Sequence, residues 1–235
     1  MSSAPFFRTT PSPDPRLSQV PLCGSFSLIL PEIENRRLCD LGCNAGYYLQ
    51  FAHPDSLGVD VSKASLSACQ KLGFQTVQHD LNNLPLPLQT ESFAVVLLSH
   101  VLEHVTMPLH LLRECNRILA TGGKLLIGLP IEDGLYSRLR MNYFAGPEGH
   151  LFSFSRANLR KLLSVSGFVD ERIVCHYPRL GNRLSVWNER LMRWFGESLF
   201  TFSAAYWCVA RKIGSPLADA QLSDYFPQDA PKNVR

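Results

Sequence analysis

The sequence lacks an apolar run long enough to cross a bilayer, for which a helix needs about 18–20 residues. It also lacks the basic segment and adjoining apolar stretch of a secretory leader, because its first residues are polar and rich in proline. No two cysteines stand at C-x-x-C spacing, which argues against a zinc or dithiol redox motif of that type. The seven scattered cysteines predict reduced thiols packed as small apolar side chains, and hence a cytoplasmic protein.

The chain has little net charge, +3, but this charge is unevenly distributed. Residues 137–213 contain twelve Lys or Arg and five Asp or Glu, an excess of +7, so the remainder carries −4. A basic half indicates either solvated helix faces or a surface that meets an anionic ligand or lipid headgroups. Because no Lys-rich run or RNA-binding motif accompanies the excess, we expect no nucleic acid partner.

Proline-rich tails flank a single apolar region. Residues 1–22 and 214–235 predict flexible segments, because their composition cannot form a packed core. Residues 23–213 are enough for one domain and too few for two. Within them, residues 183–196 carry apolar side chains at helical spacing between arginines, which predicts an inserted amphipathic helix. That helix either docks on the domain or on a second subunit, or makes weak contact with a membrane surface.

Short apolar runs alternate with helical patterns in this region, which predicts a parallel sheet covered on both faces. The predicted strands span residues 37–41, 55–60, 74–79, 93–98, 124–129, 168–175 and 202–210. We expect helices around Tyr48 and over residues 62–71 and 109–119, with Gly122-Gly123 as a helix stop. A later helix is expected between an N-cap at Ser155 and a C′ glycine at Gly167.

The most informative segment is the turn from Asp40 to Gly46, which follows the first predicted strand. A dinucleotide-binding turn needs glycines at G-x-G-x-x-G spacing, so that a pyrophosphate can approach the helix N-terminus. Here only Gly42 and Gly46 remain, and Asn44 stands between them. Asp40 would repel a phosphate but suits a positively charged ligand, such as a sulfonium that also bears an ammonium group.

Two more aspartates follow the second and third predicted strands. Asp60 stands where a carboxylate can accept hydrogen bonds from both ribose hydroxyls of a nucleoside. Its alternative role is to cap the helix that begins near Ser62. Asp80 can hold an adenine amino group, or it can be an ordinary turn aspartate. The ordered set of acidic residues therefore predicts a nucleoside-containing ligand.

The turn and the aspartates resemble the class I S-adenosylmethionine-dependent methyltransferases. Their first motif, D-x-G-C-G-x-G, corresponds to Asp40–Gly46 with Asn in place of the middle glycine, a substitution that a left-handed backbone tolerates. The segment His100-Val-Leu-Glu-His104 is similar to the common H-V-L-E-H of this family. The resemblance implies S-adenosyl-L-methionine as cofactor and an α/β fold with a Rossmann-like, doubly wound, seven-stranded sheet, mostly parallel with the last strand antiparallel. It implies cofactor-binding roles for Asp40, Gly42, Asn44, Gly46, Asp60, Val61, Asp80, Leu81 and Ser99.

The segment from Gly149 to Ser155 resembles family members that act on small molecules. It therefore predicts O-methylation of a small-molecule acceptor. If the basic residues 137–213 contact that acceptor, the acceptor is anionic. Three alternatives remain open. The acceptor can be RNA or protein, the chain can be a non-catalytic S-adenosylmethionine-binding protein of the same fold, or it can be a nicotinamide oxidoreductase, which the missing glycine disfavours.

Two histidines are candidate catalytic residues. His104 follows the strand whose end would face the methyl group, and we expect it to act as a base whose tautomer Glu103 fixes. His150 lies in a turn near the same predicted edge and is the second candidate base. The spacing of His100, Glu103 and His104 also fits the H-x-x-E-H motif of one class of zinc peptidases. Related methyltransferases bind a divalent cation through E-x-x-E-H, but His100 replaces the first glutamate, so we expect no metal.

Overall fold

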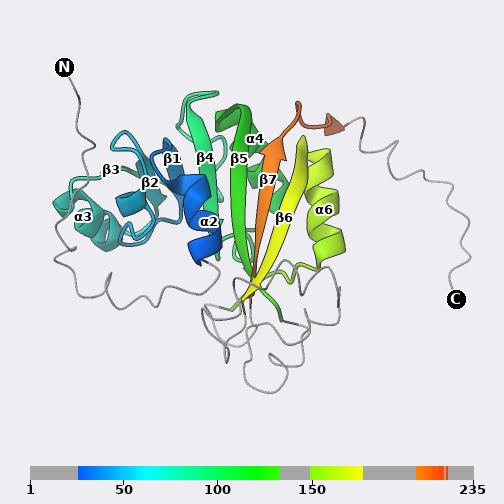
Figure 1. The fold of residues 1–235 in the computed structure, drawn as a ribbon, viewed down its shortest axis with the longest axis horizontal. Coiled ribbons are helices and arrows are strands. Elements are labelled where there is room, and N and C mark those ends of the chain that lie inside the picture. Colours follow the sequence, from blue (N-terminus) through cyan, green and yellow to red (C-terminus); the bar gives the residue numbers. More distant parts are fainter. Residues whose placement is uncertain (1–25, 133–148, 177–204, 220, 222–235) are drawn as a thin grey trace, which may run out of the picture.

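The computed structural model describes residues 26–132, 149–176, 205–219 and 221. They form a single seven-stranded sheet in the order β3-β2-β1-β4-β5-β7-β6, with helices packed against it (Figure 1). The elements are α2 (Phe26–Ile33), β1 (Leu38–Leu41), η1 (Leu49–Phe51), β2 (Leu57–Asp60), α3 (Lys63–Lys71), β3 (Gln75–Gln78), β4 (Phe93–Ser99), α4 (Pro108–Ile118), β5 (Leu119–Pro130), α6 (Arg156–Val165), β6 (Phe168–His176) and β7 (Ala205–Lys212).

The strand directions agree with those expected from the sequence. Strands β3, β2, β1, β4 and β5 are parallel neighbours, whereas β7 runs antiparallel to both β5 and β6. The last strand in the chain is therefore the antiparallel one, inserted between β5 and β6. This arrangement confirms the predicted Rossmann-like, doubly wound α/β fold.

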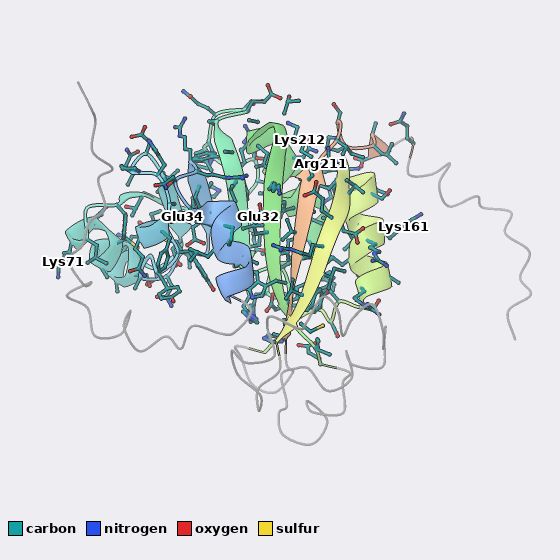
Figure 2. All side chains as sticks on the ribbon, viewed as in Figure 1. Glu32, Glu34, Lys71, Lys161, Arg211 and Lys212 are labelled. Carbon is teal, nitrogen blue, oxygen red and sulfur yellow. The ribbon has the colours of Figure 1, made fainter. Side chains whose placement is uncertain are left out.

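Each face of the sheet has its own apolar core, because successive side chains of a buried strand point to opposite faces. In β4, Val96 and Leu98 pack in the core under α4 and α6, whereas Val95 and Leu97 pack in the core under α2 and α3. An ion pair also holds α2 on its face, since Lys124 Nζ lies 2.8 Å from Glu32 Oε2. Glu32 lies over the middle of the sheet (Figure 2). Six cysteines (Cys39, Cys43, Cys69, Cys115, Cys175 and Cys208) are buried thiols in these cores, which confirms their predicted apolar role.

The helical stretch expected around Tyr48 is confirmed only as one short 3₁₀ turn, η1, for which Tyr48 is the N-cap. Residues 44–48 before it form turns. Gly46 adopts a left-handed φ of +81°, which ends helical geometry, and Pro54 stands shortly before β2. Two i→i+3 hydrogen bonds, from Phe51 N to Tyr48 O and from Ala52 N to Leu49 O, form this turn. Tyr48 also contacts Trp207 of β7 edge-on at 6.1 Å between ring centroids.

The other residues predicted to begin or end helices were confirmed only in part. Gly122-Gly123 does not stop a helix, because α4 ends at Ile118 and both glycines lie inside β5. The caps of α6 are as predicted. The Ser155 hydroxyl accepts a hydrogen bond from the Asn158 amide, and Gly167 follows the helix with a φ of +81°. Helix α2 was not predicted from the sequence.

Several predicted segments lie outside the described residues, namely residues 1–22 and the helix over 183–196. The first residues of the predicted C-terminal tail are described, and they contact the domain. Leu217 N donates to Val165 O at 2.9 Å, and Arg113 pairs with Asp219 at 2.6 Å. In the described part of the chain, no helix has both the length and the apolar character needed to span a membrane.

Candidate active site

The predicted cofactor turn and the segment after β4 meet at the carboxyl edge of the sheet. Strand β1 leads into the turn from Gly42, and β4 ends at Ser99 between β1 and β5. A methyl group added to Gly42 would lie 2.5 Å from Cγ2 of Val101, so the two segments are in direct contact. The candidate cofactor residues and the candidate histidines therefore share one edge, as parallel-sheet folds place their ligands.

The backbone of the turn has the conformation that its motif implies. Gly42 and Gly46 have φ values of +79° and +81°, and Asn44 between them has a φ of +46°. The Asn44 amide donates a 2.9 Å hydrogen bond to Oδ2 of Asp60, which fastens the turn to the end of β2. Asn at this position therefore keeps the left-handed geometry that the family's glycine would adopt.

Asp40 is a buried carboxyl group with no hydrogen-bond partner among the described residues. Its exposed fraction is 0%, and neither of its oxygens has a partner among the described residues. Burial, with smaller contributions from Cys69 and Asp60, raises the pKa of its carboxyl from 3.8 to about 8. A buried acid without a partner is costly, so the fold retains here a group that a cationic ligand would satisfy.

The aspartates after β2 and β3 occupy turns and make local hydrogen bonds. Asp60 accepts from the Ser62 amide at 2.9 Å through Oδ1, in addition to the bond from Asn44 through Oδ2. Asp80 Oδ1 accepts from the Asn82 amide at 2.9 Å. The turn roles considered for both residues are thus present. Each carboxylate oxygen can accept more than one hydrogen bond, so their ligand roles stay predictions.

The remaining predicted cofactor residues differ in exposure. The Val61 side chain is 63% exposed beside Asp60, where an apolar base can cover it. Leu81 is partly buried and packs against the core that contains α4. Ser99 Oγ lies 3.1 Å from the hydroxyl of Tyr48, a residue to which sequence reasoning gave no role in the site.

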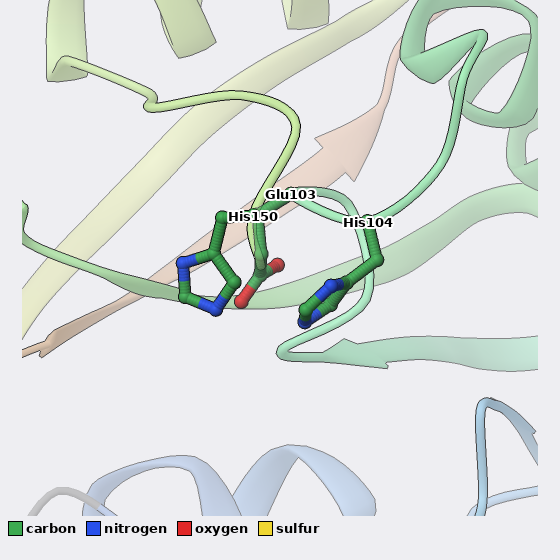
Figure 3. Close-up of side chains that lie close together, drawn as sticks. All are labelled: Glu103, His104 and His150. Carbon is green, nitrogen blue, oxygen red and sulfur yellow. The ribbon is translucent and has the colours of Figure 1, made fainter. Parts of the chain in front are cut away.

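The two candidate histidines lie against each other. The rings of His104 and His150 are 4.6 Å apart between centroids and almost perpendicular, at 82°. Glu103 lies beside them, and ligand atoms of the three residues all fall within 4.8 Å of one another (Figure 3). Residues 103 and 104 follow β4, whereas residue 150 lies beyond β5, so only the tertiary fold assembles this group.

Backbone hydrogen bonds connect these two segments. The amides of Leu151 and Phe152 donate to the carbonyl of Glu103 at 2.8 and 3.2 Å. Their side chains are exposed, as is Met107 after β4. Exposed apolar side chains therefore follow His150 directly in the chain, and they suit an acceptor with an apolar part.

The carboxylate partners of the histidines differ from those expected. Glu103 Oε1 lies 3.2 Å from His100 Nδ1, not against the ring that it was expected to orient. His150 Nδ1 instead makes a short hydrogen bond with Oε1 of Glu132, which follows β5. Sequence reasoning missed Glu132. An acidic residue three positions after a predicted strand end was its only signal.

Comparisons with known proteins agree with this geometry. Residues 39–127 match the family model described as "Methyltransferase domain". A S-adenosylmethionine-dependent methyltransferase structure from Archaeoglobus fulgidus superposes with a TM-score of 0.62 at 22% identity, covering 81% of this chain and 93% of that one. The fold and the acid–glycine turn thus define a methyltransferase domain. Residues 39–127 are thus a methyltransferase domain on the fold of the class I S-adenosylmethionine-dependent methyltransferases, a class whose cofactor is S-adenosyl-L-methionine.

Curated relatives bear names of two kinds. A tRNA U34 carboxymethyltransferase from Desulfotalea psychrophila is 30% identical over 161 residues, which cover 63% of this chain and 50% of the relative. A phthiotriol/phenolphthiotriol dimycocerosates methyltransferase from Mycobacterium ulcerans is 34% identical over 107 residues, covering 40% of this chain and 38% of the relative. The chain spans about half or less of the length of these relatives.

Proposed function

We propose that this chain transfers the methyl group of S-adenosylmethionine to a hydroxyl oxygen of a small-molecule acceptor. The oxygen attacks the methyl carbon in line with the carbon–sulfur bond. That bond breaks with its electron pair going to sulfur, which yields S-adenosylhomocysteine. The acceptor loses its hydroxyl proton beside His104 and His150, which orient the hydroxyl and assist its deprotonation. Alignment of two reactants of this kind can supply about 7–11 kcal/mol.

The observation that carries this proposal is the contact between the cofactor turn and the histidine segment. Gly42 packs on Val101, three residues before His104, so a cofactor on the turn has the histidines beside it. Asp40 supplies a buried carboxylate for the cationic part of the cofactor. The exposed side chains of Leu151 and Phe152 supply an apolar surface for the acceptor.

RNA is the second candidate acceptor, and the name of the Desulfotalea relative favours it. That name denotes transfer of a carboxymethyl group, which would bring an additional carboxylate next to the sulfonium. The predicted and observed site residues among those the structure describes include Asp40, Asp60, Asp80 and Glu103 but no lysine or arginine. Asp40, Asp60 and Asp80 at the cofactor side of the site would repel that carboxylate, which favours methyl over carboxymethyl transfer.

Binding measurements with the purified chain test the cofactor part of the proposal. We expect calorimetric titration to show binding of S-adenosylmethionine and S-adenosylhomocysteine, and much weaker binding of NAD. Replacement Asp60→Asn should weaken the cofactor by about 1.5–3 kcal/mol, because a hydrogen bond to a charged group is lost. The matched control is Asp55→Asn, an exposed aspartate before β2. Tighter binding of NAD than of S-adenosylmethionine would contradict the assignment of S-adenosylmethionine as the cofactor.

Methyl incorporation tests the acceptor. The enzyme is incubated with methyl-labelled S-adenosylmethionine and either a small-molecule extract or total tRNA, and the label is followed by mass spectrometry. We expect label on an oxygen of a small molecule. Label confined to tRNA would select the second candidate. Absence of transfer to either fraction, with intact cofactor binding, would support the non-catalytic alternative.

A further inference from the structure

The group formed by Glu103, His104 and His150 has the composition of a metal site. Figure 3 shows the carboxylate between the two rings, and the ligand atoms lie within 4.8 Å of one another. Ligands on one cation with bonds of about 2.1 Å can be at most about 4.2 Å apart. A shift of under about 1 Å closes the difference, and His104 is an exposed side chain that can rotate.

Glu103 points to a missing ligand independently of this spacing. Its side chain is 0% exposed, and Oε1 lies beside His100 Nδ1. The second oxygen, Oε2, is buried without a hydrogen-bond partner among the described residues. Leaving such an oxygen without a partner costs free energy, and a bound cation would remove that cost.

His150 is oriented as metal-binding histidines usually are. Nδ1 of His150 is hydrogen-bonded to Glu132 Oε1. The ring nitrogen that would coordinate a cation is therefore Nε2. A carboxylate behind the histidine fixes the ring and raises the basicity of the coordinating nitrogen. The Glu132 side chain is only 2% exposed, and its second oxygen, Oε2, has no hydrogen-bond partner among the described residues.

We propose that Glu103, His104 and His150 bind a divalent transition-metal cation, with Glu132 as the positioning residue for His150. Two imidazoles and one carboxylate suit zinc and similar ions, whereas magnesium prefers oxygen ligands. Three protein ligands leave a coordination position for an oxygen of the acceptor. This site deepens the proposed function and replaces the metal-free base that the sequence alone led us to expect.

The cation has a specific task in methyl transfer. A hydroxyl bound to it loses its proton to solvent more readily, because the cation stabilises the resulting oxyanion. The oxyanion then attacks the methyl carbon, the carbon–sulfur bond breaks towards sulfur, and the cation keeps its oxidation state. His104 and His150 hold the cation in this scheme instead of taking up the proton themselves.

Cation binding is measured on the full chain after removal of metal with a chelator and in the absence of cofactor and acceptor. We expect one equivalent of zinc by calorimetry, one equivalent of cobalt with visible ligand-field absorption, and weaker binding of magnesium. His104→Ala should lower zinc affinity by more than about 100-fold, because loss of a ligand exceeds the 10–100-fold effect expected for Glu132→Gln. The control His110→Ala replaces an exposed histidine of α4 and should leave the affinity unchanged.

The outcomes separate this proposal from the proposed function. Zinc binding that is lost in His104→Ala supports the site even if no methyl transfer is found. The proposal fails if the stripped chain binds neither zinc nor cobalt, if magnesium binds more tightly than zinc, or if His104→Ala and His150→Ala both keep full affinity. Full methyl transfer in chelator, together with absence of bound zinc, would overturn the site and restore His104 as a base.

Discussion

Asp40 is the site residue in which burial, ionisation and the charge of a ligand all act on one carboxyl group. Its oxygens are buried at the start of the glycine turn without partners among the described residues. Burial there makes the ionised form unfavourable, so the pKa of the carboxyl rises to about 8 in the ligand-free protein. A sulfonium or ammonium group alongside would favour the ionised form and lower that pKa again.

The stability of the ligand-free protein should therefore fall as pH rises from about 4 to 8. In this range the folded state keeps a proton on Asp40 that the unfolded state has released, since the two pKa values are about 8 and 3.8. The expected slope is up to ~1.4 kcal/mol per pH unit, and it vanishes above pH 8. Urea unfolding at several pH values measures it. Asp40→Asn should remove this component, and saturating S-adenosylmethionine should reduce it.

Parallel pH profiles for the wild type and Asp40→Asn would contradict this assignment. They would mean that Asp40 has the same pKa in the folded and unfolded states. An unchanged slope with S-adenosylmethionine bound, but a removed slope in Asp40→Asn, would mean that the cofactor's charge is not beside Asp40.

At the scale of elements, the site depends on the contact between the turn after β1 and the segment after β4. Gly42 needs to be glycine for two reasons, a φ of +79° and the proximity of Val101. The matched control is Gly122 in β5. It has a φ of +73°, but an added Cβ would have no other atom within 4 Å. The two glycines therefore separate backbone strain from packing.

Gly122→Ala should cost about 1–2 kcal/mol of folding free energy, the strain of a left-handed alanine. Gly42→Ala should cost a further ~1–3 kcal/mol, because the new methyl group overlaps Val101. It should also weaken S-adenosylmethionine binding, whereas Gly122→Ala should not. Denaturant unfolding and calorimetry measure the two quantities. Equal losses of folding free energy in the two variants would show that Val101 can move aside without a cost in free energy.

Over the whole molecule, the basic half has two different parts. In the described residues, Arg160 pairs with Asp170 and Arg211 with Glu171. Arg211 and Lys212 lie at the end of β7 that adjoins the first residues of the parallel strands, away from the candidate site (Figure 2). Most of the other arginines of this half lie outside the described residues, including those of the predicted helix over 183–196.

If the excess of +7 serves an anionic acceptor or a lipid surface, binding should weaken as salt rises to about 0.5 M. Neutralising Arg183, Arg190 and Arg193 together as glutamines should then raise KM for the acceptor, or lower binding to anionic vesicles. Arg211→Gln is the control, because Glu171 already pairs with it away from the site. If binding does not change with salt concentration and is the same in both variants, these arginines are ordinary solvated side chains.

The succession of strands and helices and the parallel character of the sheet could be predicted from the sequence, because alternating apolar runs and helical patterns indicate which faces are buried. The antiparallel last strand followed from the family resemblance, and the order of the strands within the sheet was seen only in the structure. The sequence also predicted the left-handed Asn44 and the caps of α6, since both depend on near neighbours. Near Tyr48 it overestimated the length of the helix, because only one 3₁₀ turn forms there beside the contact of Tyr48 with Trp207.

The assembly of the site, by contrast, depends on contacts between distant segments of the folded chain. His150 meets His104 and Glu132 across the carboxyl edge of the sheet, from segments that no local pattern links. The missing partners of Asp40 and of Glu103 Oε2 are likewise visible only in the folded chain, because burial removes the water that would otherwise satisfy those oxygens. The sequence thus specifies which chemical groups are present. The proximity of these groups and their removal from water, which together make them a site, result from packing between distant segments of the chain.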